Sequence, residues 1–228
     1  MQKWTFKVKS YYVKTYDEPE FNRKEILRYA GAKDSEPEIE ELIDECINEL
    51  QGKLSYKVCC SELPLLTCED SLDLTFTKVK SHDLKKNLMG CDSFVLFAAT
   101  VGIEIDRLII RYSGISPVRA LIFQAIGAER IETLANLFNN EVKDMAHSEG
   151  KQTAPRFSPG YGDLPLDVQK DIFSYLDCPR KIGLSLNESL LMSPSKSVTA
   201  FIGIGNKINV CKKNSCAACT KENCDFRR

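Results

Sequence analysis

The chain has 228 residues, with 31 Lys or Arg against 32 Asp or Glu, so its formal net charge is −1. This balance excludes the strongly basic field that nucleic-acid-binding proteins use to attract phosphates. No apolar run approaches the roughly 20 residues of a membrane-spanning helix, and the first residues lack the apolar core of a signal peptide. We therefore expect a cytoplasmic protein that contacts neither nucleic acid nor membrane and buries about 70% of its unfolded surface.

The first half of the chain is predicted to contain both strands and helices. Apolar and polar residues alternate up to about Val13, which is typical of a strand. Residues 21 to 29 and 39 to 50 carry apolar side chains at helical spacing, and Gly31 and Gly52 follow these two segments. Further strands are expected at residues 54 to 60, 72 to 78 and 93 to 98, with a short helix at residues 83 to 88.

The second half is predicted to be mainly helical until a late strand. Residues 103 to 112 and 116 to 147 show helical spacing, and Gly127 is expected to kink or divide the longer segment. A polar linker precedes Arg156, and a helix up to residue 176 and a strand from residue 197 follow. Early and late strands around central helices favour an α+β fold with a mainly antiparallel sheet, rather than a doubly wound parallel one.

Ten cysteines fall into two groups. Six are scattered through ordinary segments, and we expect them to be reduced thiols in the core: Cys46, Cys59, Cys60, Cys68, Cys91 and Cys178. The other four lie within 14 residues of a polar tail that has six Lys or Arg against two Asp or Glu: Cys211, Cys216, Cys219 and Cys224. This division predicts a domain over residues 1 to 205 and a metal-binding tail over residues 206 to 228.

The tail cysteines indicate a metal site, because four thiolates suit tetrahedral zinc or an iron–sulfur cluster. Their spacing matches neither the paired Cys-x2-Cys of zinc ribbons nor the ferredoxin run, so both metals remain open. The cationic residues around them fit an acidic electron carrier such as a flavodoxin, or they are simply solvated.

One loop combines a cation, a forced turn and a phenol: Arg156-Phe157-Ser158-Pro159-Gly160-Tyr161. Pro159 fixes its own φ, and Gly160 permits a positive φ, so backbone amides near the turn can face a ligand. Alone, this pattern also describes an ordinary surface turn. In that interpretation Arg156 forms only a surface salt bridge.

The loop and its flanks resemble the activation domain of cobalamin-dependent methionine synthase, which has an Arg-x-x-Pro-Gly-Tyr loop. The same order of pieces follows the loop: Gly183-Leu184-Ser185-Leu186-Asn187-Glu188-Ser189, then Met192-Ser193-Pro194, then Ser197-Val198-Thr199-Ala200. Residues 100 to 107 and 127 to 136 resemble free-standing members of the family. The resemblance covers roughly residues 90 to 205 well and does not extend to the cysteine tail.

The resemblance implies an S-adenosylmethionine site with no general base. Arg156 would hold the ligand carboxylate through two parallel hydrogen bonds. Ser158 would contribute backbone groups to the adenine or ribose, Gly160 would let the main chain approach, and Tyr161 would form a flat wall. Glu132 would reach the ligand amino group or Arg156, although a solvated helix position also fits it. Two departures from the family pattern stand out: Asn140 replaces a ligand-contacting glutamate, and Ile208 lies near the place of a late tyrosine.

The implied activity is of the methyltransferase type and belongs to a stand-alone reactivation protein. It would methylate cob(II)alamin, held by the cobalamin-binding domain of a partner methionine synthase, with S-adenosylmethionine and one electron. The competing hypothesis is a non-catalytic binding or regulatory module for a corrinoid protein, with structural zinc in the tail.

Overall fold

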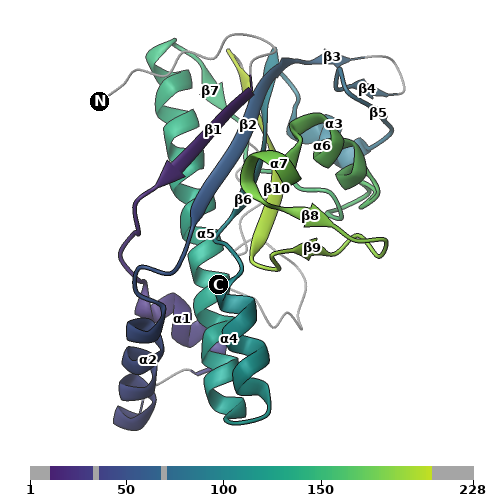
Figure 1. Cartoon of the computed structure of the whole chain (residues 1–228). Coiled ribbons are helices and arrows are strands. Elements are labelled where there is room, and N and C mark those ends of the chain that lie inside the picture. The colour runs from purple at the N-terminus through teal and green to yellow at the C-terminus, as the bar shows by residue number, and fades with distance from the viewer. Residues whose placement is uncertain (1–10, 33–35, 68–70, 207–228) are drawn as a thin grey trace.

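The structure is a computed structural model that describes residues 11–32, 36–67 and 71–206. A five-stranded antiparallel sheet lies at its centre, in the order β1-β2-β6-β10-β7 (Figure 1). These strands are β1 (Tyr11–Tyr16), β2 (Tyr56–Pro64), β6 (Ser93–Thr100), β10 (Ser197–Gly205) and β7 (Gln152–Thr153). Helices flank the sheet, and the predicted α+β class with a mainly antiparallel sheet is confirmed.

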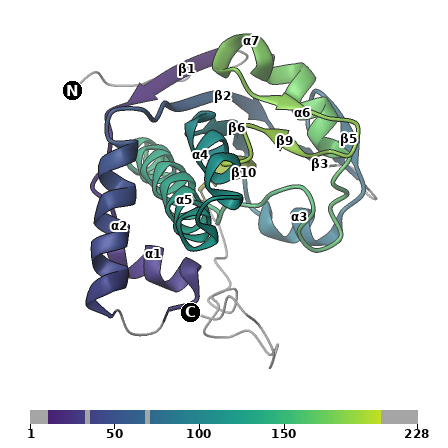
Figure 2. The same ribbon diagram turned by 60° about the horizontal axis from the view of Figure 1, so that its bottom comes forward.

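Helices cover both faces of the sheet, as the two views in Figures 1 and 2 show. One face carries α1 (Arg23–Ala30), α2 (Pro37–Leu50), α4 (Glu104–Ser113) and α5 (Pro117–Ser148). The other carries α3 (His82–Asn87), α6 (Val168–Leu176) and α7 (Cys178–Ile182). Beside these lie a small sheet of β3 (Leu66–Thr67), β4 (Leu72–Asp73) and β5 (Lys78–Val79), and a hairpin of β8 (Ser185–Leu186) and β9 (Met192–Ser193).

The position of β6 at the centre of the sheet explains why its sequence is apolar almost throughout. Side chains alternate across a strand, so Val95 and Phe97 enter the core on the α5 side. Phe94 and Leu96 enter the core on the α6 side. Because both faces of the sheet are covered, every residue from Phe94 to Thr100 is buried.

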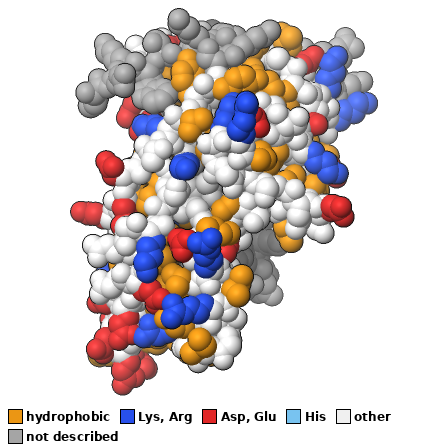
Figure 3. Space-filling view, in the orientation of Figure 1, with side chains coloured by type: hydrophobic (Ala, Val, Ile, Leu, Met, Phe, Trp, Pro, Cys, Tyr) orange, Lys and Arg blue, Asp and Glu red, His pale blue; other side chains and the backbone are white. Residues whose placement is uncertain are grey.

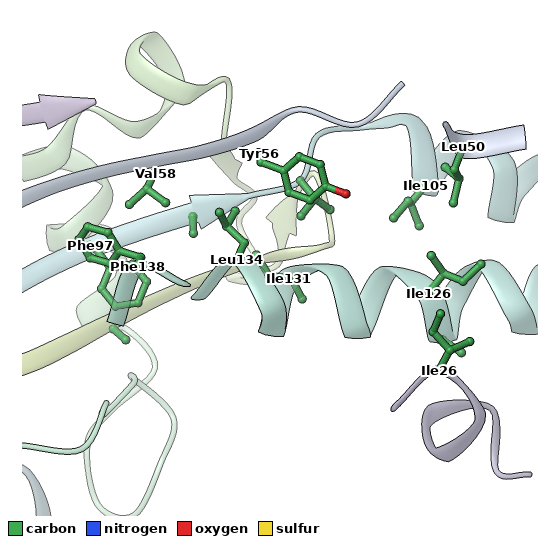
Figure 4. Close-up of a cluster of buried hydrophobic side chains, with 14 of the residues drawn as sticks. Ile26, Leu50, Tyr56, Val58, Phe97, Ile105, Ile126, Ile131, Leu134 and Phe138 are labelled. Carbon is green, nitrogen blue, oxygen red and sulfur yellow. The ribbon is translucent and has the colours of Figure 1, made fainter. Parts of the chain in front are cut away.

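Helix α5 is the longest element, with 32 residues that span roughly 48 Å. Part of it packs on the sheet, where Leu134 and Phe138 lie close to Val58 and Phe97 (Figure 4). Nearer its start, Ile126 lies beside Ile26 of α1 (Figure 4).

The predicted division of α5 at Gly127 is wrong. The helix runs unbroken from Pro117 to Ser148. A Cβ on Gly127 would lie 2.7 Å from Lys196 Cε and 2.9 Å from Ile105 Cγ2. Glycine is therefore needed at this position so that α4 and the start of β10 can approach α5 closely.

Residues 72 to 78 do not form one strand. They form β4 and β5, joined by a turn in which the Thr75 amide donates to Asp73 Oδ1 at 2.9 Å. Thr75 has φ +71°, which no strand residue adopts. The short elements α7, β8 and β9 were also absent from the prediction.

Five of the six cysteines expected in the core are free thiols, and four of those five are buried. Cys68 and the tail cysteines 211, 216, 219 and 224 lie outside the described residues, as does Ile208. Among the residues that the structure describes, no helix is long and apolar enough to cross a membrane.

Candidate functional site

The segment before the loop continues β7 along the edge of β10. The Ala154 amide donates to the Gly203 carbonyl at 2.8 Å. Phe157 and Phe201 exchange two backbone hydrogen bonds, with N···O distances of 3.0 and 2.8 Å. Arg156 lies between these attachments, so its backbone is fixed to the sheet.

The Arg156 side chain contacts α5. Its Nη2 donates to Glu132 Oε2 at 3.1 Å and to Asn136 Oδ1 at 3.0 Å. Glu132 and Asn136 are four residues apart, so they lie one turn apart on the same helix face. The Arg156 side chain keeps 23% of its exposure and the Glu132 side chain 42%, so both remain within reach of a ligand.

After Arg156 the chain folds into a compact turn. The Tyr161 amide donates to the Ser158 carbonyl at 3.2 Å, and the Gly160 amide donates to the Leu164 carbonyl at 2.9 Å. Gly160 has φ +87°, which L side chains rarely adopt. Tyr161 is 68% exposed, so its ring projects from the turn.

A pocket of about 220 Å³ lies beside the Arg156 contacts. Its lining comes from α5 and from α1 with its N-cap: Asn22, Glu25, Tyr29, Glu129, Glu132, Thr133 and Asn136. Arg156 hydrogen-bonds two of these residues, Glu132 and Asn136, and therefore stands at the edge of the pocket. The loop, α1 and α5 thus meet at one place.

A buried ion pair attaches the α1 wall to α5. Arg130 Nε lies 2.5 Å from Glu129 Oε2, and both side chains are almost fully buried. Arg130 also donates to the carbonyls of Pro19 at 2.6 Å and Glu20 at 2.7 Å. Glu129 Oε1 accepts the Asn22 amide at 3.3 Å. The chain leading into α1 is therefore held by charged groups that have almost no access to water.

The pocket lining is rich in oxygen atoms and carries negative charge. Its three carboxylates each pair with an arginine outside the lining: Glu25 with Arg28, Glu129 with Arg130, and Glu132 with Arg156. Burial raises the pKa of Tyr29, and the charge of Glu132 raises it further. Such a pocket suits a cationic hydrogen-bond donor such as an ammonium group. Within the described residues, no cluster of His, Cys, Asp or Glu is arranged to hold a metal ion.

A second acidic region has a structural explanation. Acidic side chains gather at the lower end of the surface in Figure 3, where α2 lies in Figure 1. Arg23 pairs with Glu40 at 3.0 Å and with Asp44, and Arg119 pairs with Glu45. These surface pairs connect α2 to α1 and α5, so we do not treat this region as a binding site.

The structure brings some of the predicted site residues together. Arg156 and Glu132 are in direct contact, and Ser158, Gly160 and Tyr161 form the adjoining turn. Asn140 is exposed on α5 and is not part of the pocket lining, two turns from Glu132.

Sequence reasoning missed the α1 side of the pocket and three residues of α5. A signal for the α5 residues exists, because Glu129, Glu132, Thr133 and Asn136 recur at helical spacing and form a polar stripe on one face of the helix.

The fold and this site define a class of protein: a mixed α+β domain in which an Arg-x-x-Pro-Gly-Tyr loop borders an acidic pocket. Residues 83–225 match the family model described as vitamin B12 dependent methionine synthase, activation domain. The chain belongs to this family.

A comparison with solved structures agrees at the level of the fold. A solved structure described as the MetH reactivation domain bound to AdoHcy is similar, with a TM-score of 0.60 and 15% sequence identity. The match covers 85% of this chain and 78% of that one. A search of curated proteins found no match.

Proposed function

We propose that this protein binds S-adenosylmethionine at the Arg156 loop and the adjoining pocket, and uses it to reactivate cobalamin-dependent methionine synthase. The observation that carries the proposal is the position of Arg156, whose guanidinium borders a carboxylate-lined pocket. The similar reactivation domain is described as bound to AdoHcy, the demethylated form of this ligand.

The charges of the site complement those of the ligand. Arg156 would bind the ligand carboxylate, because a guanidinium binds carboxylates through paired hydrogen bonds. Glu132 would then bind the ligand ammonium group. The backbone of Ser158 and Gly160 would border the nucleoside, and the exposed Tyr161 ring would offer a stacking surface.

The reaction needs positioning more than acid–base chemistry. One electron and the methyl group of S-adenosylmethionine would convert cob(II)alamin to methylcobalamin and release S-adenosylhomocysteine. The cobalamin would be held by the cobalamin-binding domain of the partner methionine synthase. This chain would fix the sulfonium methyl in line with the cobalt and exclude water around it.

The electron would come from outside the described domain. We propose that residues 1 to 205 form the ligand-binding domain, and that Cys211, Cys216, Cys219 and Cys224 hold an iron–sulfur cluster or zinc. Four thiolates suit either metal. A cluster would relay the electron from a flavodoxin-like donor, whereas zinc would leave the tail a structural role.

Calorimetric titration with S-adenosylmethionine tests the site. We expect the wild type to bind and Arg156→Ala to weaken binding at least about tenfold, because removing one partner of a charged hydrogen bond costs about 1.5–3 kcal/mol. Arg180→Ala is the matched control, since Arg180 is 83% exposed and pairs only locally with Asp177. Absence of wild-type binding contradicts the function, and unchanged binding by Arg156→Ala contradicts the site.

The alternative is a regulatory module for a corrinoid protein. One observation favours it: the Arg156 guanidinium is already paired with Glu132, as in a structural salt bridge. A two-protein assay separates the alternatives. Inactive methionine synthase that lacks its own activation domain should regain activity when this protein, S-adenosylmethionine and a reductant are all supplied. A regulatory module would bind the synthase without restoring activity.

A further inference from the structure

Helix α3 contacts both ends of the loop that carries Arg156. At the last residue of the helix, Asn87 Nδ2 donates to the Pro155 carbonyl at 3.1 Å. At its start, the Asp163 carboxylate accepts Ser81 Oγ at 2.5 Å, the His82 amide at 2.7 Å and the Asp83 amide at 3.2 Å. The segment from Pro155 to Asp163 therefore lies along α3 and is fixed at both ends.

We propose that α3 holds this loop in its ligand-binding shape, with Asp163 as the main positioning residue and Asn87 as the second. The inference rests on the proposed S-adenosylmethionine site and assigns a role to residues that do not touch the pocket. Asp163 acts on Arg156 through the turn of Gly160 and Tyr161, which it follows by two or three residues.

The Asp163 contacts are of a kind that fixes a backbone. The first amides of a helix have no partners within the helix, and a carboxylate satisfies them while interacting favourably with their partial positive charge. The pKa of Asp163 lies below its usual value, chiefly because the Ser81 hydroxyl donates to it and also because the His82 and Asp83 amides do. Ser81 in turn accepts the Leu84 amide at 3.0 Å, so one hydroxyl connects the helix cap to the loop.

Gly162 shows how closely the loop approaches α3. Its φ is +55°, and a Cβ on it would overlap the carboxylate of Asp83. The main chain of the loop therefore lies directly against the first turn of the helix. Such close contact needs a residue without a Cβ, which Gly162 supplies.

Two variants of Asp163 test the proposal. We expect Asp163→Ala to weaken S-adenosylmethionine binding about tenfold in calorimetry, because the loop loses three hydrogen bonds at one end. Asp163→Asn retains one acceptor oxygen and should weaken S-adenosylmethionine binding less, about threefold. The matched control is Asp167→Ala, which removes the same charge four residues away, where the carboxylate contacts only Lys170 at 2.8 Å.

A double-variant cycle distinguishes positioning from a general loss of stability. If Asp163 acts through the loop that carries Arg156, Asp163→Ala should have little further effect on affinity in the Arg156→Ala protein. Its effect on thermal unfolding should be the same in both backgrounds. Equal affinity losses in both backgrounds would overturn the proposal.

Hydrogen exchange in the ligand-free protein provides a second, independent readout. We expect Asp163→Ala to increase exchange at the amides of Gly160 and Leu164, which close the turn. Unchanged exchange at these amides overturns the proposal, and so does faster exchange with unchanged affinity. If the wild type does not bind S-adenosylmethionine at all, the proposed function fails, whereas the exchange experiment still decides whether α3 holds the loop.

Discussion

Gly160 and Gly162 have different physical roles within the same turn. Gly160 is needed for its backbone conformation, since its φ is +87° and a Cβ there would meet only Leu166 Cδ1, at 3.2 Å. Gly162 is needed for its conformation and also for space, because a Cβ there would overlap Asp83. Substitution at these two positions should therefore have unequal costs.

Gly162→Ala should lower both the free energy of unfolding and the affinity for S-adenosylmethionine. The reason is that the added methyl would force the Asp83 side chain or the loop to shift, in addition to the roughly 1 kcal/mol strain of a positive φ. Gly150→Ala is the control, because Gly150 has φ +75° with no atom within 4 Å of a Cβ. For Gly150→Ala, urea unfolding should show only the cost of the strained φ, and calorimetry should show unchanged affinity. Equal behaviour of the two variants would contradict the close-contact explanation.

Helix α5 serves two purposes along its length. Its apolar face packs against the sheet and against α1, α2 and α4, while its polar stripe forms one wall of the pocket. The pair Glu129–Arg130 lies where these purposes meet, since Glu129 both lines the pocket and holds the chain before α1. Stability and the proposed ligand binding are therefore coupled at this position.

Glu129→Ala should destabilise the fold by about 3–5 kcal/mol, because Arg130 would remain buried without its carboxylate partner. Glu149→Ala, at the end of the same helix, is the control, since Glu149 pairs with Lys151 at the surface at 2.9 Å. That exposed pair should contribute only about 0–1 kcal/mol. Urea unfolding of both variants measures the difference, and similar losses would contradict the assignment of a buried ion pair.

Much of the architecture follows from local sequence, but the pocket does not. Helical spacing predicts α1, α2, α4 and α5 within a few residues, whereas Arg156 is expected to bind a ligand only because of the family resemblance, since the loop pattern alone also fits a surface turn. Residues 72 to 78 misled the prediction because Leu72, Leu74 and Phe76 alternate like a strand. The Asp73–Thr75 hydrogen bond turns the chain there instead.

The α1 wall could not be predicted, because it depends on contacts between residues about 110 apart in sequence, such as Arg130 with Pro19 and Glu20. Local spacing predicts a helix at residues 21 to 29, and its apolar residue Ile26 is buried. Nothing in that spacing indicates which helix α1 packs against, so Tyr29 and Glu25 could not be assigned to a site.

The whole molecule is a sheet covered on both faces, and the candidate site draws on each side. Arg156 extends from the edge of β10 to α5 on one face, whereas Asp163 contacts α3 on the other. The described residues end just after β10, whose residue Gly205 pairs with Gln152 of β7. All residues of the candidate site lie before this point.

A chain truncated after Asn206 should therefore fold and bind S-adenosylmethionine with an affinity within about twofold of the full chain. The metal proposed for the tail should be lost, because the four tail cysteines are removed. Calorimetry, thermal unfolding and elemental analysis measure these three properties. Truncated protein that folds but loses the ligand would show that the tail contributes to the site, and would contradict the proposed domain division.

The ion pair between Arg156 and Glu132 has a consequence for selectivity. A ligand with only a carboxylate would compete with Glu132 for the Arg156 guanidinium and supply no counter-charge to Glu132. A ligand with only an ammonium group would compete with Arg156 for Glu132 and supply no counter-charge to Arg156. A zwitterion supplies a counter-charge to each residue at once, so one internal pair is exchanged for two external ones. Simple anions and simple amines should therefore compete poorly at this site, even at concentrations far above that of an amino-acid ligand.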